Sequence, residues 1–171
     1  MHCKRLAIFA INLALLTIGL PPLAIGQEKA ASWTGCYAEA SGGYAIIKAD
    51  GTLRAKEIGV GAGCDYQIDA NFLIGGMVRY DFGDIRIASA QLRAGYLINK
   101  DLLAYGLVNV MADGKSWNFG QSIYSAGAGV ETKLGTSQVH LFGEVAKDLA
   151  FSGADKPDSA LTFRAGLRYR F

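Results

Sequence analysis

The sequence is poor in the side chains that carry most catalytic and metal chemistry. It has two histidines and three cysteines in 171 residues, and His140 is the one histidine that follows residue 26. There is no Cys/His cluster at metal-ligand spacing and no Gly-x-Ser-x-Gly elbow. There is also no glycine-rich loop followed by Lys and Ser or Thr, which would cradle phosphate. We therefore expect no catalytic residues, no cofactor and no metal.

The sequence also lacks a surplus of charge beyond its first 26 residues. The chain holds 17 Lys and Arg against 15 Asp and Glu, and Lys4 and Arg5 account for the difference. A basic cluster with interleaved aromatic residues, the footprint of nucleic-acid binding, does not appear. We expect no nucleic-acid partner.

Long hydrophobic runs are missing after residue 26. The one long run, Leu6 to Leu20, follows Lys4 and Arg5 and is broken by Pro21-Pro22, as in a secretory signal. It is shorter than the roughly 18–20 apolar residues of a spanning helix. We expect a signal peptide over 1–26, a short polar lead over 27–32 and one domain over 33–171.

What the sequence does have is alternation of polar and apolar residues. In the last eleven residues, LTFRAGLRYRF, apolar side chains take every second position, and Thr, Gly and three arginines lie between them. Successive side chains of a strand point to opposite faces, so one apolar and one polar face are predicted. The pattern recurs between turn signals and predicts eight strands. They cover about 33–47, 57–68, 72–82, 88–98, 102–112, 124–134, 139–148 and 161–171.

The distribution of residues between the two faces favours a membrane barrel over a soluble sandwich. One face of each segment carries almost no charge, and aromatic residues lie near the segment ends, as in interfacial girdles. The other face holds glycines and charges that a sandwich core would have to bury unpaired. Only helices and closed sheets satisfy their backbone groups in lipid. The prediction is an all-β, eight-stranded antiparallel up-and-down transmembrane barrel. A soluble lipocalin-like periplasmic carrier is the alternative.

Three motifs carry a resemblance to a known family. SWTGCYAEASGGY at 32–44, GAGVETKL at 127–134 and the terminal GLRYRF at 166–171 resemble small outer-membrane barrels of the opacity and OmpA-like type, above all alphaproteobacterial surface antigens. The resemblance implies outer-membrane localisation and a structural or surface role. It also implies that the terminal aromatic strand, with Tyr169 and Phe171, is read by the barrel-assembly machinery. Cys36 departs from the family pattern, which usually has an aromatic residue there.

The polar face is expected to hold an ion network inside the barrel. Pairing about the last loop places Glu144 opposite Arg164, and closure is expected to bring Glu39 to the same height. Arg168, Glu131 and Arg93 are expected to form a second tier. Two readings remain open: structural filler, or a narrow gated small-solute channel of the porin kind. Eight strands leave an interior barely wide enough for side chains.

The remaining candidates lie at the ends and on the outer face. Cys36 and Cys64 face each other across the first turn, so either a disulfide or two lipid-facing thiols is possible. Lys48, Arg54 and Lys56 are expected near the outer rim, where they contact either lipopolysaccharide phosphates or solvent alone. His140 is expected to hydrogen-bond in the lumen. A lipid deacylase would need a serine two residues after it, where Phe142 stands. Outer-membrane lipid is the expected partner, and the oligomeric state is expected to be a monomer.

Overall fold

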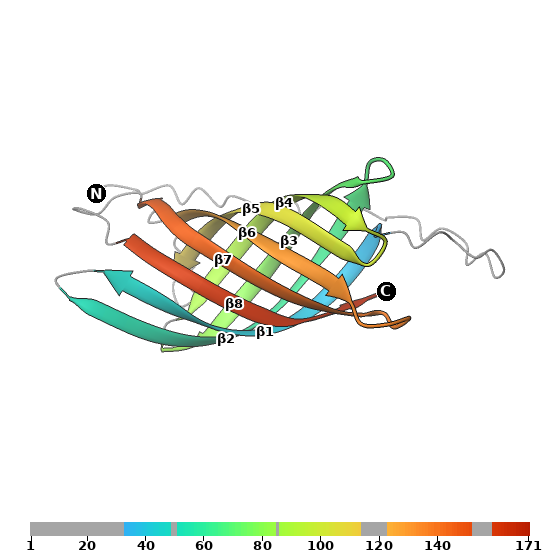
Figure 1. Ribbon diagram of the computed structural model, residues 1–171. Coiled ribbons are helices and arrows are strands. Elements are labelled where there is room, and N and C mark those ends of the chain that lie inside the picture. The colour runs from blue at the N-terminus through green and yellow to red at the C-terminus, as the bar shows by residue number, and fades with distance from the viewer. Residues whose placement is uncertain (1–32, 49–50, 85, 114–122, 152–158) are drawn as a thin grey trace, which may run out of the picture. The chain divides into compact units, whose positions relative to one another are not determined.

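The computed structural model describes residues 33–48, 51–84, 86–113, 123–151 and 159–171. They form eight antiparallel strands closed into a barrel (Figure 1). The strands are β1 (Gly35–Lys48), β2 (Thr52–Gln67), β3 (Phe72–Gly83), β4 (Ile87–Asn99), β5 (Leu102–Asp113), β6 (Ile123–Lys133), β7 (Val139–Phe151) and β8 (Ser159–Arg170). The predicted eight-stranded antiparallel up-and-down barrel is confirmed. The signal peptide and polar lead fall outside the described residues.

Each strand pairs with the next in the chain, and β8 pairs with β1 to close the barrel. The row of paired residues that starts at Ser41 passes through β2, β3 and β4 and reaches Asp113 of β5. In the other direction it passes through β8, β7 and β6 and reaches Leu103 of the same strand. This ten-residue offset is the shear of the barrel, which accompanies the tilt of its strands.

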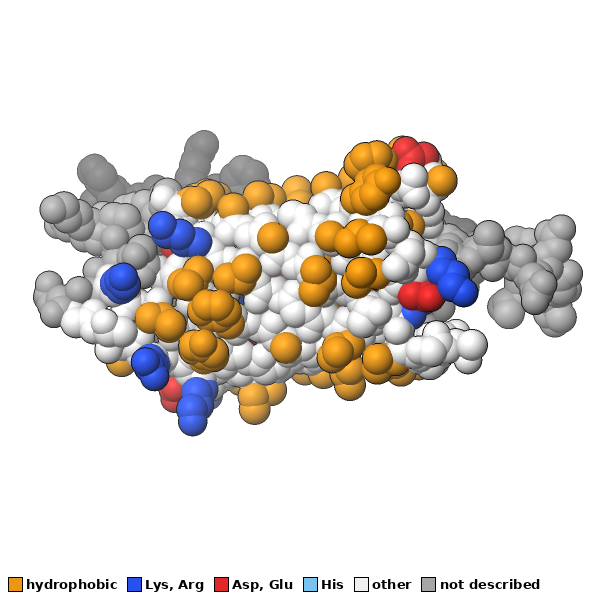
Figure 2. All heavy atoms as spheres, viewed as in Figure 1, with side chains coloured by type: hydrophobic (Ala, Val, Ile, Leu, Met, Phe, Trp, Pro, Cys, Tyr) orange, Lys and Arg blue, Asp and Glu red, His pale blue; other side chains and the backbone are white. Residues whose placement is uncertain are grey.

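Side chains alternate between the lumen and the outside of the wall, as the sequence predicts. Large apolar residues such as Ile58, Tyr66 and Val78 are exposed on the outside, whereas Tyr37 and Glu39 are buried in the lumen. Figure 2 shows hydrophobic side chains across the wall and charged ones confined to the two ends of the face in view. No helix in the described part of the chain is long and apolar enough to cross a membrane.

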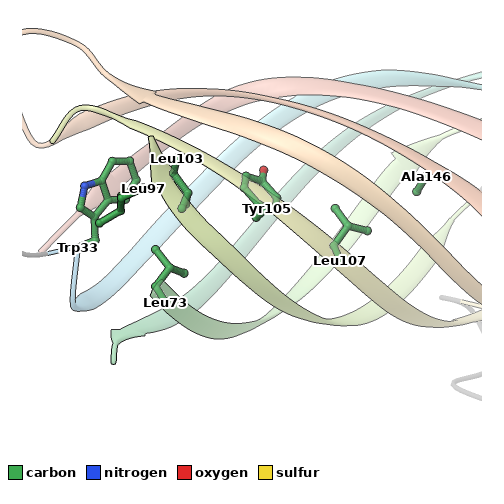
Figure 3. Close-up of a cluster of buried hydrophobic side chains, with 7 residues drawn as sticks. All are labelled: Trp33, Leu73, Leu97, Leu103, Tyr105, Leu107 and Ala146. Atoms are coloured by element: carbon green, nitrogen blue, oxygen red, sulfur yellow. The ribbon is translucent and has the colours of Figure 1, made fainter. Parts of the chain in front are cut away.

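The two ends of the barrel differ in what fills them. A buried apolar cluster extends along the lumen from the end where β1 begins and β8 finishes, here the terminal end (Figure 3). At that end Trp33 lies beside Leu97 and Leu103, and its indole Nε1 donates to the Lys100 carbonyl at 3.2 Å. Leu107 and Ala146 belong to the part of the cluster further from Trp33. The opposite end, with the β1–β2 hairpin, is here the loop end.

The connections are close to those expected, with one correction at the first hairpin. The turns at the terminal end lie between β2 and β3, β4 and β5, and β6 and β7, near the predicted positions. The connection between the first two strands is shorter than the gap between the predicted strands 33–47 and 57–68, because β1 continues to Lys48 and β2 begins at Thr52. Lys48, Arg54 and Lys56 therefore belong to strands. Cross-strand pairing continues to the Lys48–Thr52 pair, which extends this hairpin.

Candidate functional site in the barrel lumen

The lumen contains a continuous network of ion pairs. Alternation along seven strands turns its members inward, and each carboxylate lies within 4 Å of at least one arginine nitrogen. The network comprises Arg79, Arg93, Arg164, Arg168 and Arg170 together with Glu39, Glu57, Asp65, Asp81, Glu131 and Glu144. Buried charges are stable in such surroundings only when they are paired and hydrogen-bonded.

Arg168 of β8 is the centre of the network and is completely buried, with 0% of its surface exposed. Its guanidinium donates to Glu39 at 2.8 Å, to Glu131 at 2.5 Å and to Glu144 at 2.8 Å. It also donates to the Tyr105 hydroxyl at 3.2 Å. The guanidinium carbon lies 4.0 Å from the centre of the Phe142 ring. One side chain thus links strands on opposite sides of the lumen and blocks its middle.

Arg93 and Arg170 continue the network toward the terminal end. Arg93 forms an ion pair with Asp65 and donates to Glu131 at 2.8 Å. Arg170 donates to Asp65 at 2.5 Å and to the Trp33 carbonyl at 2.9 Å. The charges therefore connect directly to the apolar cluster that fills this end.

His140 also lies in this part of the lumen, where hydrogen bonding was expected. Its Nδ1 is 2.8 Å from Glu131 Oε1, and its ring packs edge-on against Trp33. Phe142, two residues later, packs against Arg168. Among the described residues, no group of three His, Cys, Asp or Glu side chains is placed to hold a metal ion.

Arg79 and Arg164 extend the network toward the loop end. Arg79 donates to Glu39 at 2.5 Å and lies 3.4 Å from Glu144. Arg164 lies 2.7 Å from Glu57, 3.4 Å from Asp81 and 3.9 Å from Glu144. The Arg164 and Glu57 side chains are slightly exposed, unlike that of Arg168. The Arg170 side chain, toward the terminal end, is exposed to a similar extent.

The structure brings the six expected network residues together but changes one pairing. Glu144 and Arg164 are opposite each other in the β7–β8 register, as expected. Glu39 is opposite Arg168 across the seam, and Arg164 is opposite Gly43. The expectation that Glu39 and Glu144 bracket Arg164 is therefore wrong, because the shear displaces β1 by four residues relative to the assumed closure. Glu57 takes the place assigned to Glu39.

Several members of the network are not among the six residues predicted from the sequence. Arg79, Asp65, Asp81 and Arg170 are of this kind, and Tyr105, which donates to Glu144 at 2.8 Å, was not singled out. The available signal was parity, since each occupies an inward position on its strand. Whether a residue is at an odd or even position in its strand identifies the face on which it lies. It does not give the position of the residue along the barrel axis, which depends on the shear.

On the outside of the wall, Cys36 and Cys64 form a disulfide near the terminal end. The two residues are direct register partners in β1 and β2. Next to them, the Phe171 amide donates to the Cys36 carbonyl at 3.0 Å, so the end of the last strand is fixed to the first. The rings of Phe171 and Tyr169 lie 5.5 Å apart on the outer face, and Phe171 is 76% exposed.

At the loop end, Lys48, Arg54 and Lys56 are all exposed. They occupy the outward positions of the β1–β2 hairpin, with Lys56 opposite Tyr44 and Arg54 opposite Ile46. Tyr44 stacks on Phe163 of β8 at 5.2 Å between ring centres. The hairpin therefore presents three cations immediately beyond an aromatic pair on the apolar wall.

No family model and no curated protein matches the chain. Solved structures do. A designed transmembrane β-barrel has a TM-score of 0.54 at 14% identity, over 82% of this chain and 98% of that one. Ail, the attachment invasion locus protein of Yersinia pestis, has a TM-score of 0.53 at 16% identity, over 82% and 100%. Neisserial surface protein A has 0.50 at 16%, over 81% and 98%. At these identities the likeness shows a shared fold.

Proposed function

We propose that this chain is a non-enzymatic barrel of the bacterial outer membrane that does not conduct solutes and has a structural or surface role in the envelope. The apolar outer wall supports membrane insertion and disfavours the soluble carrier, since a soluble protein would expose this wall to water. The barrels that share its fold support the outer membrane as its location. The family resemblance of its motifs supports an opacity-like surface protein.

The observation that carries the non-conducting assignment is the closed lumen. Arg168 bonds to side chains of β1, β5, β6 and β7, and the apolar cluster around Trp33 fills the terminal end behind it. A solute would have to break several buried charge-assisted hydrogen bonds to pass. Breaking one such pair costs about 3–5 kcal/mol. Opening the network fully would therefore cost far more than thermal energy.

The test is current across planar bilayers that contain the refolded protein. We expect no steps above the bare-membrane background. Regular steps from the wild-type protein would favour the channel alternative. Arg168→Ala is the matched variant, because it removes the central side chain without changing the wall. Fractionation addresses the carrier alternative, which predicts release by osmotic shock rather than recovery with outer membranes.

A second role is supported by the β1–β2 hairpin, whose exposed Lys48, Arg54 and Lys56 adjoin the aromatic pair Tyr44–Phe163. We propose that these three cations contact the phosphates of lipopolysaccharide. Replacing all three by Gln should weaken co-sedimentation with vesicles that contain lipid A. Lys100→Gln at the terminal end is the control. Equal binding by the triple variant and the wild type would contradict the proposal and would mean that the three cations contact solvent alone.

We further propose that Phe171 and Tyr169 form the signal read by the barrel-assembly machinery. Both rings point outward from the last strand, where another protein can reach them. Phe171→Ala should reduce the amount of folded barrel in cells and leave refolding into detergent unaffected. Phe72→Ala, at an exposed aromatic position on β3, should leave assembly in cells unchanged.

A further inference from the structure

A compact polar cluster lies on β1, β2 and β3 toward the loop end of the lumen. Ser41, Gly59 and Asp81 are direct register partners on these three strands. Glu57 is the inward residue two positions before Gly59, and Arg164 of β8 pairs with both Glu57 and Asp81. Ser41, Glu57, Gly59, Asp81 and Arg164 are here called the loop-end cluster. It adjoins the block around Arg168, since Arg164 also lies 3.9 Å from Glu144.

The loop-end cluster carries the negative excess of the lumen network. Around Arg168, four arginines face four carboxylates: Arg79, Arg93, Arg168 and Arg170 with Glu39, Asp65, Glu131 and Glu144. In the loop-end cluster, Arg164 alone faces both Glu57 and Asp81. A single guanidinium between two carboxylates leaves one negative charge, which favours an additional cation.

Among the described residues in and around the loop-end cluster, most of the buried side-chain atoms without a hydrogen-bond partner are oxygens, and Arg164 Nε is the one nitrogen. Ser41 Oγ and Asp81 Oδ1 are buried and accept no hydrogen bond in the described structure, and the residues are 7% and 1% exposed. Glu57 Oε1 is within ion-pair distance of Arg164 but is not hydrogen-bonded. Across the lumen, Gln91 Oε1 and Asn109 Oδ1 are also without a donor. A buried acceptor without a donor costs about 1–3 kcal/mol.

Two of these oxygens converge on one point above Gly59. A Cβ placed on Gly59 would clash with Asp81 Oδ1 and would lie 2.9 Å from Ser41 Oγ. Because residue 59 is glycine, both oxygens can approach this part of the wall. The Glu57 and Arg164 side chains of the cluster keep a slight contact with solvent. A ligand beside these oxygens would meet a carboxylate and a hydroxyl together.

We propose that the loop-end cluster binds a small cation that donates N–H hydrogen bonds, of the alkylammonium class. The excess carboxylate supplies the charge complement, and the oxygens of Ser41 and Asp81 accept the N–H groups. A divalent metal is disfavoured, because the described residues contain no group of three carboxylate, His or Cys side chains placed to bind one. Arg168 closes the lumen on the terminal side of the site.

The test is a titration of the refolded, isotopically labelled barrel in detergent micelles with methylammonium chloride, followed by NMR. Saturable shifts are expected at the Gly59 and Asp81 amides, and NaCl at the same ionic strength should give none. Asp81→Asn should weaken binding at least tenfold. Asp101→Asn, which removes a carboxylate from the β4–β5 turn at the terminal end, should bind like the wild type.

Gly59→Ala tests the geometry without changing the charge, since its methyl group occupies the point where the oxygens converge. It should also weaken binding at least tenfold while the barrel keeps its gel shift on boiling. The proposal is overturned by an absence of saturable shifts, by equal binding to wild type and Asp81→Asn, or by saturation with MgCl₂ but not with methylammonium. None of these outcomes depends on whether the protein conducts.

Discussion

Glu131 is shared by three arginines, since Arg93, Arg168 and Arg170 lie 2.8, 2.5 and 3.0 Å from its oxygens. His140 bonds to it as well. The residue is completely buried. Its negative charge therefore compensates several positive ones in a place that water does not reach.

Glu131→Gln is expected to lower the free energy of unfolding by about 3–5 kcal/mol, because it removes a buried counter-charge that three guanidinium groups share. The measurement is urea unfolding in detergent, followed by tryptophan fluorescence. Glu57→Gln is the control, since Glu57 pairs with one arginine near solvent. A similar loss in both variants would contradict the special position of Glu131.

At the level of single residues, parity predicted which charges point inward but not which of them pair. Glu39, Glu131, Glu144, Arg93, Arg164 and Arg168 all lie in the lumen network. The predicted β1 partner of Arg164 was wrong, since alternation contains no information on the register between β8 and β1. That displacement is a property of the closed sheet.

At the level of elements, alternation located all eight strands, and Gly, Asn and Asp located most turns. The predicted strand ends were wrong at the first hairpin, because 48 and 52–56 were left outside the strands. Pairing of Lys48 with Thr52 shows that the sheet continues to both sides of the turn signal at 49–51. Favourable cross-strand pairing extends the strands beyond the residues that clear alternation identifies.

The disulfide belongs to the β1–β2 element and encloses a segment with a sequence separation of 28. Restricting the unfolded chain by a loop of this length is worth about 3–4 kcal/mol. The Cys36→Ala/Cys64→Ala double variant should therefore unfold at lower urea concentration than the oxidised wild type. The reduced wild type should match the double variant. Identical midpoints for all three proteins would show that the bond does not contribute to stability.

The β2–β3 turn depends on Asp69, whose Oδ1 accepts the amides of Asn71 and Phe72, both at 2.8 Å. These bonds lower the pKa of the carboxyl group from its usual value. A lowered pKa in the folded state means that Asp69 stabilises the barrel above its unfolded pKa, and that this stabilisation is lost as the pH falls through the folded one.

Asp69→Ala should thus be less stable than the wild type at pH 7, and the difference should shrink as the pH falls below about 4. Urea midpoints at pH 7, 5 and 3 measure this. Asp101→Ala in the β4–β5 turn provides the comparison. A difference that does not depend on pH would mean that Asp69 acts through its shape rather than its charge.

For the whole molecule, closure by β8 leaves none of the eight strands as an open edge. Detergent cannot separate such a sheet without breaking a complete ladder of hydrogen bonds. Unboiled protein in a denaturing gel should therefore migrate as a compact band, and boiling should shift it to the position of the unfolded chain. A single band position before and after boiling, with protein that is soluble without detergent, would contradict the membrane assignment.

The Phe171–Cys36 hydrogen bond has a topological consequence, because it places the beginning and the end of the sheet side by side. A short linker from Phe171 to Trp33 would turn the barrel into a ring with no preferred starting strand. The chain could then be opened at the β1–β2 tip, and the same closed sheet should form with a new strand order. Such a circular permutant would show that the barrel is defined by its cyclic neighbours rather than by which strand is made first.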